Sequence, residues 1–165
     1  MSESRLRTCA ALTAVTTLSV AAVLCSPVAH ADNSRLNSGV AINVYTLQHQ
    51  AGCTTDVKVN PQLQRAAERH TDDVLNNHDL DGDTGSDGST PQSRAQAAGF
   101  NGDVAETVAI NPALAISGLE VLHQWYYNPA YYAIMADCAH TAIGVWSANS
   151  LDRSVVVAVY GTPAR

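Results

Sequence analysis

The stretch Ser86-Asp87-Gly88-Ser89-Thr90-Pro91, continued by Arg94 and by Ala97-Ala98-Gly99-Phe100, is the most informative part of this 165-residue chain for its architecture. Its first half is rich in Ser, Asp and Gly, a composition typical of polar turns. Thr90 before Pro91 is a helix start signal and Gly99 is a stop signal, so the second half predicts a short helix.

The segments on both sides of this stretch also carry helix signals. Over residues 35–49, apolar side chains recur at the spacing of one helical face. Asn60-Pro61 begins a second helix that should end near Asn76. Asn111-Pro112 repeats the same signal and predicts a later helix. This later helix is expected to turn three side chains inward, those of Leu119, Leu122 and Tyr126.

The pattern changes to strands toward the C-terminal end. Residues 142–146 and 154–160 are rich in Val, Ile and aromatic side chains, and a polar segment separates them, which predicts an antiparallel pair. Residues 54–59 can supply a third strand. Helices that come first and a hairpin that comes last predict an α+β domain, in which helices pack on a small antiparallel sheet.

The N-terminal segment 1–31 has the pattern of a secretory signal peptide. Arg5 and Arg7 precede an apolar run over 10–24, and Ala29-His30-Ala31 offers a small-x-small cleavage site. We therefore predict that cleavage occurs near Ala31, and that residues 32–165 form a single domain that is secreted or held in the cell envelope. The apolar run is shorter than the about 20 residues of a membrane span, and no later stretch is longer, so no membrane span is expected.

The charge of the chain limits the partners that we expect, and its cysteines bear on the redox environment. Without residues 1–31 the formal charge is about −7, and such a surface repels nucleic acid and anionic lipid headgroups. Nucleic acid is therefore not an expected partner. Cys53 and Cys138 are the cysteines that remain, and two cysteines in an oxidising compartment usually pair. The alternative is two free buried thiols, which is less favoured in an exported chain.

The order of these motifs resembles that of the CAP superfamily, the cysteine-rich secretory, antigen 5 and pathogenesis-related 1 proteins, also called SCP domains. The stretch over residues 86–91 is similar to the Gly-Ser-Asp-Gly-Ser-Thr-Pro segment of bacterial secreted members. Trp125 with Asn128-Pro129 is similar to Trp-x-x-Ser-Pro, and Ile143-Gly144-Val145 to the family's Ile-Gly-Val strand. The resemblance implies a three-layer α/β/α sandwich around a central antiparallel sheet. If the strands that follow Cys53 and Cys138 are neighbours in that sheet, the two sulfurs can meet.

The resemblance also implies a cleft, in which this chain diverges from the family. Family members place two histidines and two acidic residues there and can hold a divalent metal. In this chain Asp83 and Tyr131 occupy the histidine positions, Glu106 matches one acidic position, and Glu120 is a candidate for the other. Zinc is not expected, because zinc sites depend on His and Cys. Asp83 and Glu106 could hold calcium or magnesium weakly, although carboxylates in a wet cleft are more often only solvated.

The histidines leave an enzymatic alternative open. His78 or His123 could act with Glu106 as an acid–base pair in a hydrolase, provided that one of them lies within hydrogen-bond reach of Glu106. His70 falls on the apolar face of its helix and is expected to be a hydrogen-bonded core residue.

Tyrosines cluster around Pro129 and admit two interpretations. They either fill the gap between a helix and the sheet, or form the wall of a site for an apolar or carbohydrate ligand. The cluster comprises Tyr126, Tyr127, Tyr131 and Tyr132.

The function expected from these features is a secreted CAP-type binding or signalling module without catalytic activity, with a degenerate ligand cleft at Asp83, Glu106 and Tyr131. The alternatives are a hydrolase, a lipid- or sterol-binding protein and a structural wall component. The expected partner is a small apolar, lipid or glycan ligand, or an envelope or host protein. Fold-level kinship does not choose among these functions.

Overall fold

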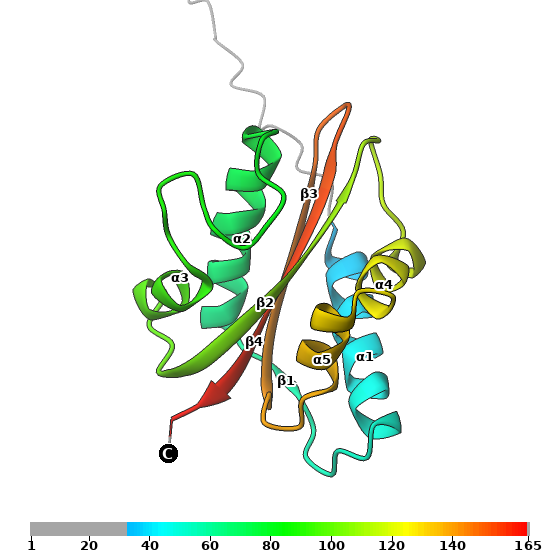
Figure 1. Ribbon diagram of the computed structural model, residues 1–165, viewed down its shortest axis with the longest axis vertical. Coiled ribbons are helices and arrows are strands. Elements are labelled where there is room, and N and C mark those ends of the chain that lie inside the picture. Colours follow the sequence, from blue (N-terminus) through cyan, green and yellow to red (C-terminus); the bar gives the residue numbers. More distant parts are fainter. Residues whose placement is uncertain (1–32, 165) are drawn as a thin grey trace, which may run out of the picture.

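The computed structural model describes residues 33–164, so the predicted signal peptide and its cleavage site lie outside the described residues. Five helices and four strands follow one another in this range (Figure 1). In chain order they are α1 (Ser34–Gln50), β1 (Lys58–Val59), α2 (Pro61–Asn76), α3 (Pro91–Ala97), β2 (Gly102–Asn111), α4 (Gly118–Tyr126), α5 (Pro129–Ala136), β3 (Ala142–Asn149) and β4 (Ser154–Pro163). None of these helices between residues 33 and 164 is long and apolar enough to cross a membrane.

The elements form three layers, which confirms the predicted α/β/α sandwich. The sheet has the strand order β1-β3-β4-β2. Helices α2 and α3 cover one face, and α1, α4 and α5 cover the other (Figure 1). Each face carries its own apolar core, so the sheet is buried on both sides. The β3–β4 pair is antiparallel as predicted, and β2 also pairs with β4 in antiparallel, whereas β1 pairs with β3 in parallel.

The predicted start signals of α2 and α3 are confirmed as side-chain caps. The Asn60 side chain accepts hydrogen bonds from the Gln62 and Leu63 amides ahead of α2. Thr90 and Ser93 form a reciprocal capping box at the start of α3. These caps satisfy amide groups that have no partner inside a helix, so both helices begin at their prolines.

The predicted helix that begins at Asn111 is wrong. Asn111 is the last residue of β2, and α4 begins only at Gly118, where the Ser117 hydroxyl accepts from the Glu120 amide. The face of α4 also differs from the prediction, because Val121 and Trp125 are buried. Leu119 is 81% exposed and Tyr126 is 51% exposed. Helix α5 and strand β2 had not been predicted.

A disulfide joins Cys53 to Cys138, as predicted, with a Cα–Cα distance of 5.2 Å. Each cysteine precedes its strand, β1 or β3, and these two strands are parallel neighbours. Their N-terminal ends therefore lie together, and the bridge ties β1 to the central sheet at that end.

Candidate functional site

A buried polar cluster lies between the sheet and the α2–α3 layer. It consists of Glu106 on β2, Arg94 on α3 and His70 on α2. Arg94 Nη2 donates to Glu106 Oε1 at 2.9 Å, and His70 Nε2 lies 3.4 Å from the same oxygen. All three side chains are at most 1% exposed. We call these three residues the polar cluster.

The polar cluster also anchors the loop between α2 and α3. Arg94 donates to the Asp83 carbonyl oxygen at 2.6 Å and to the Ser89 carbonyl oxygen at 2.8 Å. His70 Nε2 lies 3.0 Å from the Gly82 carbonyl oxygen, so this nitrogen carries the proton and donates. Residues 82–89 are thus held to the core by backbone contacts with two buried side chains.

Burial decides the charge state of the cluster. It raises the pKa of the Glu106 carboxyl to about 8, and the nearby Arg94 guanidinium only partly offsets this rise. Burial also lowers the pKa of His70, against the opposite effect of its hydrogen bond with Gly82. Near neutral pH Glu106 is therefore mostly protonated and His70 is neutral. Arg94 then donates to Glu106 Oε1 as it would to a carbonyl oxygen.

The three predicted cleft residues come near one another without direct contact. The Asp83 carboxylate is exposed, and Thr84 Oγ1 donates to it at 3.4 Å. Tyr131 on α5 is half-buried; burial raises its pKa, a hydrogen bond with the Val108 backbone lowers it, and the charges of Asp83 and Glu106 raise it further. Among the described side chains, Asp83, Glu106 and Tyr131 share no hydrogen bond.

The other predicted site residues lie away from Glu106. His78 is exposed just after α2. His123 on α4 packs on Tyr127, with their ring centroids 4.7 Å apart. Glu120 is exposed and accepts from Gln124 Nε2 at 3.3 Å. In the described range, the histidine that reaches Glu106 is His70, which the sequence had indicated only as a core residue.

Sequence reasoning missed Arg94 as a partner of Glu106. Arg94 belongs to the motif over residues 86–100, yet nothing in that motif shows that its guanidinium is buried. No sequence signal marks that burial, which the structure shows by placing Arg94 on the inner face of α3 beside the fully buried Ala95. A buried arginine requires a carboxyl or carbonyl partner, and Glu106 is the acid that is buried within residues 33–164.

The residues at this site do not fit a divalent cation. In residues 33–164, no three His, Cys, Asp or Glu side chains gather where they could hold a metal. Glu106 Oε1 faces the Arg94 guanidinium, whose positive charge opposes a cation at that oxygen.

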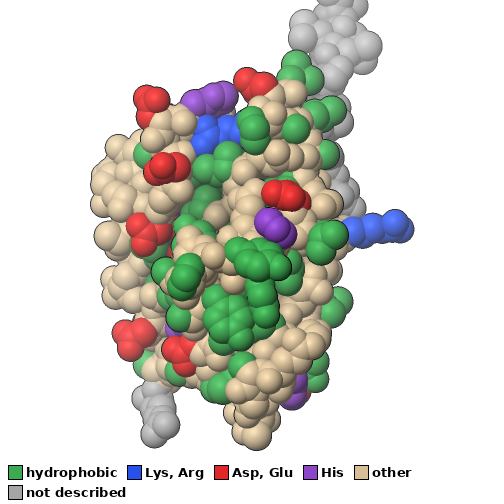
Figure 2. Space-filling view, turned by 45° about the vertical axis from the view of Figure 1, so that its right-hand side comes forward, with side chains coloured by type: hydrophobic (Ala, Val, Ile, Leu, Met, Phe, Trp, Pro, Cys, Tyr) green, Lys and Arg blue, Asp and Glu red, His purple; other side chains and the backbone are tan. Residues whose placement is uncertain are grey.

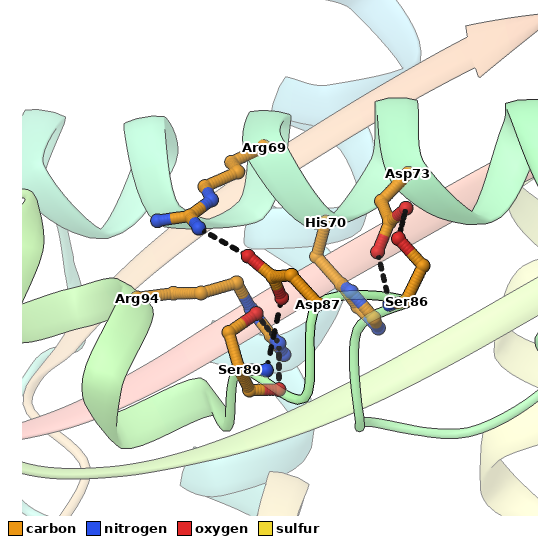
Figure 3. A pocket seen from close by; sticks show the side chains of 7 residues that line it. All are labelled: Arg69, His70, Asp73, Ser86, Asp87, Ser89 and Arg94. Carbon is orange, nitrogen blue, oxygen red and sulfur yellow. Dashed lines mark hydrogen bonds and ion pairs between the residues drawn. The ribbon is translucent and has the colours of Figure 1, made fainter.

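A shallow polar pocket of about 180 Å³ lies above the polar cluster (Figure 3). Its rim groups bind one another, since Asp73 accepts from the Ser86 amide and hydroxyl, and Arg69 pairs with Asp87 at 2.6 Å. The rim side chains of Arg69, Asp73, Ser86 and Asp87 therefore already have partners, whereas His70 Nδ1 and Arg94 Nε in the lining have none among the described residues. The lining residues are Arg69, His70, Asp73, Ser86, Asp87, Ser89 and Arg94.

Exposed tyrosines form a surface on α4 and α5, where hydrophobic side chains gather on the face in view in Figure 2. Tyr126, Tyr127 and Tyr132 are 51%, 72% and 38% exposed. The ring of Tyr126 meets Tyr127 at 79° and Tyr132 at 86°, both edge to face. We call these three residues the tyrosine surface. These three residues are exposed, whereas Tyr131, the fourth tyrosine of the cluster, packs against the core, so each of the two interpretations holds for part of the cluster.

The fold and the site together define a class of protein, a small disulfide-bonded α/β/α sandwich with a buried acid–arginine pair under one helical layer. The family model of the cysteine-rich secretory proteins, CAP, matches residues 39–160. The chain therefore belongs to the CAP family, as the order of its motifs had indicated. Comparison with curated proteins finds no match.

Solved structures of the same fold come from several bacteria. An outer surface protein from Borrelia burgdorferi has a TM-score of 0.70 at 15% identity, over 82% of this chain and 98% of that one. An extracellular SCP-domain protein from Bacillus anthracis has a TM-score of 0.64 at 12% identity, over 78% and 40%. A cysteine-rich secretory protein from Staphylococcus aureus has a TM-score of 0.57 at 11% identity, over 82% and 40%. The chain spans about two-fifths of the latter two proteins, and likeness at these identities concerns the fold alone.

Proposed function

We propose that the mature chain is an extracellular CAP domain that binds a ligand and has no hydrolytic activity of its own. The observation that carries this proposal is the burial of Glu106. The motif resemblance assigns this acid to the family's acidic position, but its side chain is 0% exposed and its Oε1 accepts a hydrogen bond from Arg94. A general acid or base must reach the proton that it transfers, and a sealed carboxyl does not reach a substrate.

The hydrolase alternative requires a histidine that is free to exchange protons. His70 lies within 3.4 Å of Glu106, but it is also 0% exposed, and its Nε2 donates to the Gly82 carbonyl. Its lowered pKa keeps it neutral. The pair is better explained as a structural link between the sheet and the 82–89 loop.

The proposal is tested with Glu106→Gln and, as the matched control, Glu120→Gln, which changes an exposed glutamate. Both variants and the wild type are assayed on casein, a peptide mixture and p-nitrophenyl esters. We expect all three proteins to show only the background rate. Hydrolysis by the wild type that Glu106→Gln abolishes and Glu120→Gln retains, with both variants folded by circular dichroism, would overturn the proposal.

The tyrosine surface supports a neutral glycan as the ligand. Tyrosine offers an apolar ring face and a polar hydroxyl, which suits the C–H faces and hydroxyl edges of a sugar. Three rings set at near right angles form a corner rather than a flat apolar patch. The formal charge of −6 for the whole chain opposes anionic polymers and anionic lipid headgroups.

Several observations support an extracellular location. The predicted signal peptide would direct export, and the disulfide suits an oxidising compartment. Two of the structural neighbours are described as an outer surface protein and an extracellular protein.

A further inference from the structure

The two edges of the sheet differ in how they are protected. On the outer edge of β2, Gln92 Nε2 donates to the Gly102 carbonyl at 3.0 Å and Gln92 Oε1 accepts from the Val104 amide at 3.1 Å. At the other end of β2, Gln124 makes the same pair of bonds with the amide and carbonyl of Ile110, at 3.3 and 3.1 Å. Both glutamine amides therefore make the hydrogen bonds that a neighbouring strand would make, and both ends of this edge are covered.

The opposite edge, formed by β1, has no such cover. The Lys58 amide donates to the Thr141 carbonyl at 3.0 Å, and the Asn60 amide donates to the Ile143 carbonyl at 2.8 Å. Because backbone directions alternate along a strand, the amide and carbonyl of Val59 point away from β3. No partner for them occurs in the described residues, and the Val59 residue is 64% exposed.

An apolar groove of about 270 Å³ runs beside this open edge, between α1 and β1. Ile42 on its wall is 63% exposed, and Tyr45 is 40% exposed. No charged side chain lines it, so the groove suits an apolar side chain. The lining residues are Ser38, Ala41, Ile42, Tyr45, Val57, Val59 and Ile143.

We propose that this edge and groove bind an extended segment of another polypeptide by strand addition. The segment pairs its backbone with the amide and carbonyl of Val59, and its alternate side chains enter the groove. Side chains on a strand point to opposite faces in turn, so the segment carries apolar residues at every second position. An acidic residue between them suits Lys58, whose side chain lies on the other face.

The size of the surface favours a short segment over a second copy of the chain. Stable protein dimers bury about 800 Å² on each partner. Strand β1 has two residues, and the groove beside it has seven lining residues. A lipid would fill the groove but leave both backbone groups of Val59 unpaired. The site is separate from the polar cluster and the tyrosine surface, so it does not depend on the proposed glycan ligand.

The test uses a displayed library of random seven-residue peptides, selected on the mature domain. Val59→Pro removes the free amide, and proline is tolerated on an edge strand where the amide faces solvent. Ile42→Ser changes the groove wall, and Leu151→Ser is the matched control, because Leu151 is 89% exposed in the β3–β4 turn. We expect the enriched peptides to have apolar residues at alternate positions. Their affinity should fall at least about tenfold for Val59→Pro and for Ile42→Ser, and should be unchanged for Leu151→Ser.

Each other result overturns the inference. Equal selection on wild type and Val59→Pro would exclude strand addition at this edge. If Val59→Pro does not fold, equal affinity for Ile42→Ser and Leu151→Ser excludes the groove. Amide shifts of the labelled domain that map to α4 and α5 would place the peptide elsewhere. A dimer detected by sedimentation without peptide, and lost in Val59→Pro, would make the occupant a second copy.

Discussion

Glu106 and His70 respond to pH in opposite directions. Glu106 has a folded-state pKa of about 8 against an ordinary value of 4.5, so its contribution to stability is full below pH 4.5 and is lost as the pH rises through 8. His70 has a lowered pKa, so its contribution is full above its ordinary value of 6.5 and is lost as the pH falls below it. Above pH 6.5, a further rise in pH therefore lowers the free energy of unfolding through Glu106 and not through His70.

Glu106→Gln should therefore flatten the fall of the melting temperature between pH 6.5 and pH 8. The amide keeps the size of the side chain and removes the carboxyl that must ionise in a buried site. Arg94, His70 and the nearby Asp83 are the charged or titratable groups that face it, and they remain. Differential scanning fluorimetry measures the slope, with Glu120→Gln as the control. The same slope in the wild type and Glu106→Gln would contradict this account.

Arg94→Met should destabilise the fold more than any change at the pocket rim. It leaves Glu106 Oε1 and the Asp83 carbonyl without the Arg94 donor, whereas the Ser89 carbonyl keeps its hydrogen bond from the Gly85 amide. Each buried acceptor that is left without its donor costs about 1–3 kcal/mol. Arg69→Met is the matched control, because it breaks an ion pair whose side chains are both 52% exposed and should cost less than about 1 kcal/mol. Urea unfolding measures both changes, and equal costs would refute a structural role for the cluster.

At the scale of elements, the outcome of each sequence signal has a physical reason. Asn60-Pro61 and Thr90-Pro91 were read correctly, since a cap acts through contacts within one turn. The helix start predicted at Asn111-Pro112 was wrong, because the same residue pair also suits the end of a strand before a turn. Strand β2 was missed, because both of its faces are covered and Glu106 through Ala109 are all buried. No alternation of apolar and polar residues therefore marks it.

For the candidate site, the order of motifs led to Glu106 as a predicted cleft residue but did not indicate its contacts. Its pairing with Arg94 and His70 joins three elements, and spacing along the chain does not encode such contacts. The tyrosines show the same limit, since Trp125 turns inward while its neighbour Tyr126 faces outward.

The glycan proposal is tested by substitutions in the tyrosine surface of α4 and α5. Tyr127→Ala, alone and with Tyr132→Ala, removes ring faces that are 72% and 38% exposed, so the fold should be retained. We expect glycan affinity to fall at least about tenfold, as it does when an exposed aromatic anchor is lost. A neutral and anionic glycan array followed by calorimetry makes the measurement. Leu114→Ala, at an apolar position that is 57% exposed, is the control. Binding that survives loss of both rings would reject the tyrosine surface.

At the scale of the whole molecule, the disulfide links the start of the shortest strand to the central sheet. The bridge spans 85 residues, and closing so long a loop reduces the freedom of the unfolded chain. The paired substitution Cys53→Ser with Cys138→Ser should lower the free energy of unfolding by about 3–5 kcal/mol. Guanidinium unfolding measures it, with the wild type in reductant as the second sample. A variant as stable as the oxidised protein would contradict this expectation.

The glutamine-covered edge of β2 has a consequence for how copies of this protein behave at high concentration. Fibres grow by edge-to-edge pairing when each copy of a protein has two free sheet edges, one for each neighbouring copy. Within residues 33–164, the sheet has an uncovered edge at β1, whereas Gln92 and Gln124 cover both ends of the β2 edge. Any strand that joins at β1 therefore ends the assembly. The covered ends of β2 therefore oppose polymerisation of this chain through its own sheet.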